Sequence, residues 1–258
     1  MARRRHEKGP WFWRGAIGTM LASVFGLFAV MAFNQPPALS ADTNCRVDRK
    51  DPAHTILLID QSDPFTENDL GWVQEFVDAE ARNLPRYGRL TVMTPNAADP
   101  YDPRIVFTSC TPGSAEDANP ILSNPRMVED TWRDQFFQPL SSEIAATLKS
   151  KRQSASPLSE ALFAAADRAD FQNGRTERRV VLVSDLMQHS ADYSFYKSGA
   201  NFEAFSQTKL ADFMPSMKGV DVVARIVPRR EYDLPLGEVK TFWRAYFRET
   251  GATYESVN

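Results

Sequence analysis

Short apolar runs alternate along most of this chain with stretches of helical periodicity. Two runs, HTILLID and RVVLVSDL, are mainly apolar and carry an acidic residue at or next to their end. This pattern is typical of central strands that are buried on both faces of a sheet. Together with three weaker runs they predict five strands, at residues 54–60, 89–94, 104–110, 179–186 and 221–227.

Amphipathic stretches separate these predicted strands. Thr66 to Asp69 resembles a capping box before a helix, and a longer apolar stripe extends to residue 148 with Pro139 inside it, which should kink or split the helix. Ser156-Pro157 has the form of a helix start, with the serine as N-cap. Two further helices are expected at residues 202–214 and 235–250.

Strands that are separated by helices indicate an α/β fold. We expect a doubly wound, mostly parallel sheet with helices on both faces. Ligands of such sheets bind beyond the carboxyl ends of the central strands.

The N-terminal region has a different pattern. Residues 15–33 form an uncharged apolar stretch long enough to cross a hydrocarbon core as a helix, with Trp11 and Trp13 at its start. Basic residues precede it, which places the N-terminus in the cytoplasm. We therefore expect an uncleaved signal anchor. The alternative is a cleaved signal peptide with a processing site near residues 38–41.

The expected organisation follows from these patterns. It comprises a cytoplasmic basic tail at 1–14, a transmembrane signal anchor at 15–33, a linker at 34–52 and one extracytoplasmic domain at 53–258. In a Gram-negative cell the domain would lie in the periplasm.

Charge and cysteine content exclude some classes of function. The whole chain has a net charge of −3, and without its first fourteen residues 25 basic and 32 acidic residues remain, a net of −7. So acidic a domain is a poor nucleic-acid binder. Cys45 and Cys110 lack the spacing of a zinc site. In an exported domain they are expected to form a disulfide, the alternative being two unpaired thiols.

Oxygen-bearing side chains follow the two strongest predicted strands. Asp60 and Ser62 come directly after the first, Asp185 ends the fourth, and Ser156 stands at a predicted helix start. If they converge at one sheet edge, their carboxylates and hydroxyls suit a hard divalent cation such as Mg²⁺.

In this order the four residues resemble the metal-ion-dependent adhesion site of the von Willebrand factor type A (VWA) family, over residues 53–257. Asp60 and Ser62 match the first two positions of the family's DxSxS motif, while Pro64 replaces its second serine. Ser156 stands where the family has threonine, and Asp185 matches the final aspartate. The resemblance implies one antiparallel edge strand and recognition of a protein through bound metal. The alternative is a degenerate site without metal.

The sequence motifs for other functions are less complete. A strand ending in Asp60 resembles the haloacid-dehalogenase-like phosphatases, but these need a second aspartate where Ser62 stands. The three histidines lie far apart in the sequence, and His189 is interpreted as a loop residue. Tyr193, Phe195 and Tyr196 either form an exposed contact surface or fold back over the sheet edge.

The prediction from sequence is therefore a non-enzymatic, membrane-anchored VWA-like module that binds another protein outside the cytoplasm. Its metal ligands would be Asp60, Ser62, Ser156 and Asp185. Two alternatives stay open: a phosphatase-like, metal-dependent hydrolase using Asp60 and Asp185, and a structural subunit of an envelope complex without metal.

Overall fold

The computed structural model describes residues 10–33, 37–119, 123–149, 152–172, 177–227 and 234–257. The chain divides into two compact units, Met1–Ala38 and Leu39–Asn258. In the first unit, helix α1 (Pro10–Phe33) covers the predicted apolar segment. Among the helices that the structure describes, none combines the length and apolarity of a membrane span. The predicted transmembrane helix is thus not confirmed.

The described strands of the second unit form one six-stranded sheet in the order β3-β2-β1-β4-β5-β6. β3 pairs with β2 in antiparallel fashion, and every other pair is parallel. This confirms the predicted mostly parallel sheet with one antiparallel edge strand. The bounds are β1 Ala53–Ile59, β2 Arg89–Thr94, β3 Arg104–Cys110, β4 Glu177–Ser184, β5 Val220–Ile226 and β6 Thr253–Val257.

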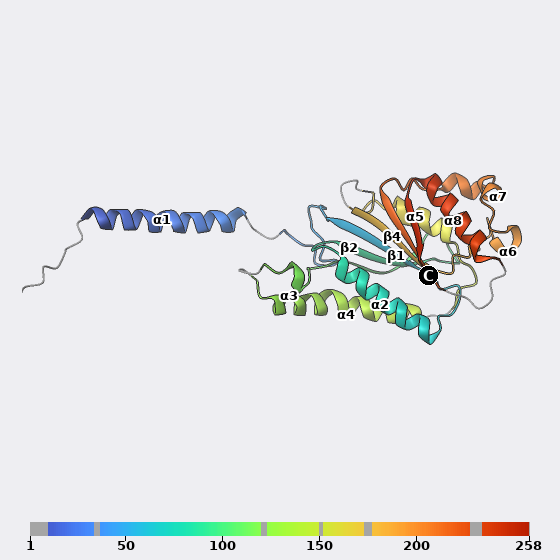
Figure 1. The fold of residues 1–258 in the computed structure, drawn as a ribbon, viewed down its shortest axis with the longest axis horizontal. Helices are drawn as coiled ribbons and strands as arrows, with labels where there is room; N and C mark the ends of the chain where they lie inside the picture. The colour runs from blue at the N-terminus through green and yellow to red at the C-terminus, as the bar shows by residue number, and fades with distance from the viewer. Residues whose placement is uncertain are drawn as a thin grey trace, which may run out of the picture. The chain divides into compact units, whose positions relative to one another are not determined.

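Helices cover both faces of the sheet (Figure 1). One face packs against α2 (Glu67–Asn83), α3 (Pro125–Trp132) and α4 (Gln138–Leu148). The other packs against α5 (Leu158–Asp167), α7 (Phe202–Ser206) and α8 (Leu236–Thr250). Shorter helical segments are η1 Ala115–Asp117, η2 Arg133–Phe137, α6 Phe195–Ser198 and η3 Lys209–Phe213.

The continuous apolar run of β1 follows from this layering. Ile56 and Leu58 belong to the core cluster under α5 and α8, whereas Leu57 and Ile59 belong to the cluster under α2 and α4. All four side chains are 0–1% exposed. Because successive strand residues point to opposite faces, a strand covered on both sides is apolar at successive positions, as residues 56–59 are.

Two local signals fix where the helices begin. Thr66 and Asp69 form the predicted capping box: the Thr66 side chain accepts the Asp69 N–H, and the Asp69 carboxylate accepts the Thr66 N–H at 2.8 Å. The long helix before residue 148 is split as expected, since a π-helical turn (η2) separates α3 from α4, where Pro139 lies in the first turn.

The predicted helix at 202–214 is not continuous. Both the N–H and the hydroxyl of Thr208 donate to the carbonyl of Phe205, at 2.9 and 2.7 Å. This threonine therefore closes α7, and the 3₁₀ turn η3 follows it.

The predicted disulfide is present. Cys45 is bonded to Cys110, 65 residues further along the chain, and both are buried. The bond attaches the segment before β1 to the end of β3.

Candidate functional site

The predicted site lies at the carboxyl edge of β1 and β4. The N–H of Asp60 donates to the carbonyl of Val183 at 2.9 Å, so the aspartate continues the β1–β4 ladder by one residue. Its side chain is only 3% exposed. The capping box of α2 then limits the β1–α2 connection to a short loop that carries Ser62 and Asp63.

The Asp60 carboxylate accepts hydrogen bonds from its own loop and from two distant parts of the chain. Its Oδ2 accepts the hydroxyl of Ser156 at 2.7 Å and the hydroxyl of Ser184 at 2.9 Å. Its Oδ1 accepts the N–H of Ser62 at 2.9 Å. Three of the four predicted site residues are thus brought together, with Asp60 at the centre.

Ser156 has a different local role from the predicted one. Helix α5 begins at Leu158, and Pro157 occupies the N-cap position without a capping hydrogen bond of its own. The Ser156 hydroxyl instead donates to Asp60, and the Ser156 backbone exchanges two hydrogen bonds with His189, each of 2.8 Å. Capping would use the oxygen of this hydroxyl as an acceptor, whereas the contact with Asp60 uses its proton in a hydrogen bond to a carboxylate, which is among the stronger kinds.

Asp185, the fourth predicted residue, directly follows β4 and is 2% exposed. Its Oδ1 accepts the N–H of Met187 at 3.0 Å, which closes the turn after β4. Leu186 in that turn has a left-handed φ of 65°, and its carbonyl accepts the indole N–H of Trp243 at 2.8 Å. Asp185 therefore lies at the same edge of the sheet as Asp60, in a turn that is hydrogen-bonded to Trp243 of α8.

A groove of about 540 Å³ opens beside this cluster and is here termed the edge groove. Ser62 and Ser156 line it, together with Arg152, His189 and Tyr196. Arg152 donates from Nε to the Ser62 carbonyl at 2.6 Å and pairs through Nη2 with Asp63 at 2.9 Å. Its side chain is 67% exposed, so a guanidinium group stands in the groove within reach of a ligand.

The aromatic residues beyond β4 divide between core and surface. Tyr193 and Phe195 are 4% and 1% exposed and fold back onto α8, as the second of the two alternatives expected. Burial raises the pKa of the Tyr193 phenol. Tyr196 is 50% exposed and its ring meets that of His189 edge-on at 5.3 Å. Only Tyr196 of the three offers an exposed aromatic surface.

Sequence reasoning missed two groups that support the site. Ser184 donates to Asp60 and accepts the Leu186 N–H at 2.8 Å. Gln188 connects the turn after β4 to α5: its Nε2 donates to Glu160 at 3.0 Å, and its Oε1 accepts the Ser159 N–H at 2.9 Å. Glu160 is fully buried, and this burial raises its pKa. A serine directly before Asp185 was the available signal for the first group.

The donor set fits a hard cation. A serine hydroxyl that gives its proton to Asp60 keeps its oxygen lone pairs available, and both Ser62 and Ser156 line the groove. Carboxylate and hydroxyl oxygens are the ligands that Mg²⁺ accepts. The Arg152 guanidinium in the same groove opposes a cation, although its pairing with Asp63 reduces that effect.

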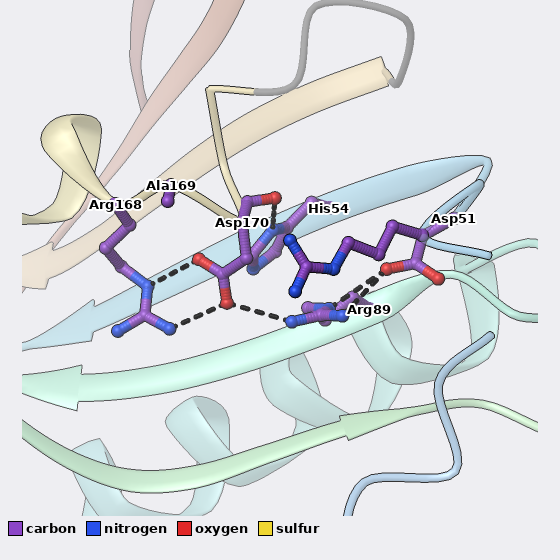
Figure 2. A pocket seen from close by; sticks show the side chains of 7 residues that line it. Asp51, His54, Arg89, Arg168, Ala169 and Asp170 are labelled. Atoms are coloured by element: carbon purple, nitrogen blue, oxygen red, sulfur yellow. Dashed lines mark hydrogen bonds and ion pairs between the residues drawn. The ribbon is translucent and has the colours of Figure 1, made fainter. Parts of the chain in front are cut away.

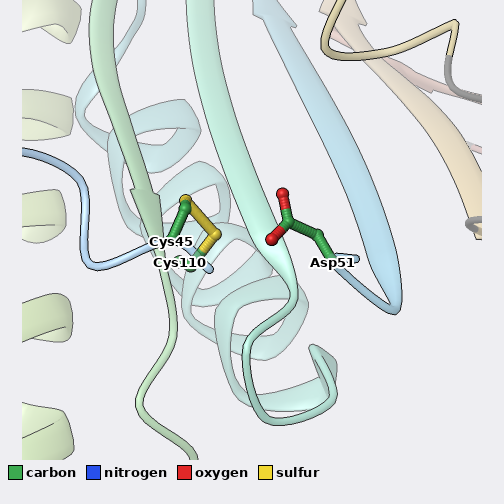
Figure 3. A group of neighbouring side chains, drawn as sticks. All are labelled: Cys45, Asp51 and Cys110. Atoms are coloured by element: carbon green, nitrogen blue, oxygen red, sulfur yellow. A yellow bond between two sulfur atoms is a disulfide. The ribbon is translucent and has the colours of Figure 1, made fainter. Parts of the chain in front are cut away.

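A second cluster has the proximity of a metal site but not its chemistry. Sulfur and carboxylate atoms of Cys45, Cys110 and Asp51 lie within 4.8 Å of one another (Figure 3). The two sulfurs are joined in a disulfide, so neither is a thiolate, and Asp51 is paired with Arg89 at 2.9 Å. This cluster is therefore structural.

Strand order, the antiparallel edge strand and the Asp60 cluster at the carboxyl edge together define a VWA-like domain. No protein-family model matches the chain, and no characterised protein matches its sequence.

Among solved structures the chain is similar to the ArnB paralog VWA2 of Sulfolobus acidocaldarius, at 10% identity and a TM-score of 0.45. That match covers 81% of this chain and 42% of the other. It is also similar to BatB, a conserved hypothetical protein of Bacteroides thetaiotaomicron (13% identity, 80% and 90% covered, TM-score 0.43). The pilus adhesin SpaC of Lactobacillus rhamnosus GG is similar at 9% identity (87% and 29% covered, TM-score 0.47). The chain thus spans less than half the length of the first and third of these proteins.

Proposed function

We propose that this protein is a non-enzymatic binding module that recognises another protein outside the cytoplasm through the edge groove. The observation that carries the proposal is the hydrogen bond from Ser156 to Asp60, which joins residues 96 positions apart beside an open groove. A buried carboxylate that fixes one serine hydroxyl and one backbone N–H beside a concave surface is suited to a site that binds a polar group of a partner.

The environment of Asp60 favours binding over hydrolysis. Both of its oxygens already accept hydrogen bonds, and the side chain is 3% exposed. A nucleophilic carboxylate must reach the reacting atom of its substrate. Asp60 instead positions Ser62 and Ser156, so the hydrolase alternative has less support.

The groove suggests which group of the partner is bound. The Arg152 guanidinium uses Nε and Nη2 for Ser62 and Asp63, and its Nη1 is left to donate to a carboxylate. Ser62 and Ser156, with Asp60 and Asp185 behind them, would hold Mg²⁺, which would supply a further positive charge for the same carboxylate. We therefore propose an acidic side chain of the partner as the group that enters the groove.

We further propose that residues 15–33 anchor the module in a membrane with its N-terminus in the cytoplasm. The absence of charge in this segment and the five basic residues before it support the proposal. The Cys45–Cys110 disulfide supports an oxidising compartment for the domain. In a bacterium with two membranes this compartment is the periplasm.

The test of partner binding is site-specific photo-crosslinking in intact cells. A photoreactive amino acid in place of Tyr196 should give adducts of discrete mass. The same amino acid in place of Arg244, which is exposed on α8, serves as the matched control and should give none. Identical adducts from both positions, or none from Tyr196, would contradict binding at the edge groove.

The metal is tested separately by calorimetric titration with Mg²⁺. The protein should bind Mg²⁺ and the Ser156→Ala variant should bind it more weakly, because the variant lacks one hydroxyl ligand. If the Tyr196 adducts persist in the presence of a chelator and disappear in Arg152→Gln, recognition depends on the guanidinium and not on the metal.

A further inference from the structure

A second cavity lies at the opposite edge of the sheet, where β1 and β2 begin. Its volume is about 540 Å³. Three arginines line it, Arg49, Arg89 and Arg168, together with Asp51, His54 and Asp170 (Figure 2). These six residues are here termed the arginine pocket. The pocket shares no residue with the edge groove.

Most of the charge in the arginine pocket is paired internally. Arg89 lies between the two acids: its Nη2 is 2.9 Å from Asp51 and its Nη1 is 2.8 Å from Asp170. Arg168 donates a hydrogen bond to each carboxylate oxygen of Asp170, from Nε at 3.0 Å and from Nη2 at 2.7 Å (Figure 2). The two carboxylates are therefore occupied by Arg89 and Arg168.

Arg49 is left over. Its side chain is exposed, and no hydrogen bond or ion pair joins it to any other residue that the structure describes. His54 adds no positive charge near neutrality, because burial lowers its pKa to about 4. Three guanidinium groups against two carboxylates give the pocket an excess of one positive charge. Arg168 also has a further nitrogen, Nη1, beyond the two that bind Asp170.

Several contacts fix the backbone of the segment that carries Arg49. Its N–H donates to the carbonyl of Arg46 at 3.1 Å, and its φ of 55° is unusual for a residue with a side chain. Four residues earlier, Cys45 is bonded to Cys110, and the carbonyl of Thr43 accepts the Cys110 N–H at 2.8 Å. The segment that presents Arg49 is thus fastened to β3.

We propose that the arginine pocket binds a phosphate group, held between the guanidinium groups of Arg49 and Arg168. Planar guanidinium groups match the oxygens of a phosphate, and a concave wall concentrates the field of the excess charge. Arg89 acts as a positioning residue, since its ion pairs fix Asp51 and Asp170 against the sheet. The phosphate source is free phosphate or the headgroup of a phospholipid.

Calorimetric titration of the full chain with inorganic phosphate, at low ionic strength and with chloride as the reference anion, tests the proposal. Arg49→Gln removes the unpaired charge without breaking a described contact, so the variant should fold and bind phosphate about tenfold more weakly. Arg168→Gln should lose a similar factor. Arg244→Gln, an exposed arginine outside the pocket, is the control and should bind as the wild type does. Absence of saturable binding, or equal weakening in the control, would overturn the proposal.

Glycerol 3-phosphate distinguishes the two sources. Tighter binding than inorganic phosphate, sensitive to Arg49→Gln, assigns the pocket to a phospholipid headgroup, whereas weaker binding with the same sensitivity assigns it to free phosphate. Replacing Cys45 and Cys110 together by serine should also weaken phosphate binding, because Arg49 is then no longer held. Retention of full affinity in Arg49→Gln would refute the assignment for either source.

Discussion

Replacing Asp60 by alanine should destabilise the domain strongly, and the size of the effect follows from its three hydrogen bonds. Two serine hydroxyls and one backbone N–H lose their acceptor in a place that is 3% exposed. A hydrogen bond to a charged group contributes about 1.5–3 kcal/mol. The freed hydroxyls can rotate towards other partners, so the contributions do not add fully. We expect a loss of about 3 kcal/mol in the free energy of unfolding.

Asp60→Asn provides a sharper comparison. An amide has one oxygen, and if this oxygen accepts both serine hydroxyls, the NH₂ group faces the N–H of Ser62. At least one of the three bonds is then lost in either orientation of the amide. The expected cost is about half that of alanine, and Asp99→Asn, at an exposed position, should cost almost nothing.

Urea unfolding followed by tryptophan fluorescence measures these differences, since Trp132 and Trp243 are 2% and 0% exposed. The slope of the free energy against urea should stay unchanged. A cost below about 1 kcal/mol for Asp60→Ala would refute the reasoning, because three buried donors would then have lost their acceptor with little change in the free energy of unfolding. A cost for asparagine equal to that for alanine would show that charge, and not the number of acceptors, matters at this position.

Three further predictions concern the core of the domain. Replacing Cys45 and Cys110 together by serine should lower the free energy of unfolding by about 4 kcal/mol, the chain-entropy value for a loop of this length, and an unchanged urea midpoint would contradict it. Burial lowers the pKa of His54 to about 4 in the fold, against 6.5 in the unfolded chain. As the pH falls, the unfolded chain takes up the proton at a higher pH than the folded protein does, so the free energy of unfolding should fall by up to about 3 kcal/mol between pH 6.5 and 4. His54→Gln should flatten this pH dependence. Burial raises the pKa of Glu160, so its ionisation costs stability as the pH rises through the folded value; Glu160→Gln should raise the melting temperature at neutral pH and have little effect below pH 4.5, and a lower melting temperature at neutral pH would refute this.

Most of the sheet was predictable because its strands carry a strong hydrophobic signal. β2 and β3 have the predicted bounds, and β1, β4 and β5 differ from them by one or two residues. β6 was not predicted. It has five residues, with Thr253 and Glu255 exposed, so no apolar periodicity marks it; it forms because the backbone of β5 offers it a ladder.

The site was predictable only in part, and for a physical reason. Asp60, Ser62 and Ser156 carry oxygen donors at positions that the alternation of strands and helices sends to one edge. The hydrogen-bond partner of Ser156 depends on the tertiary structure. The sequence suggests that its side chain caps α5, but in the fold its hydroxyl donates to Asp60 at 2.7 Å. Arg152 illustrates the same limit, since its place in the edge groove depends on how the segment before α5 crosses the β1–α2 loop.

The position of β1 at the centre of the sheet has a consequence for the whole domain. His54, near its beginning, lines the arginine pocket, and Asp60 follows its last residue. Six residues of extended chain separate these two side chains by about 20 Å. A ligand at one end therefore leaves the other end accessible, and the energetic effects of Arg49→Gln and Asp60→Ala should simply add. If both proposed sites bind their ligands, the same buried strand would keep the two binding events independent and set their mutual orientation.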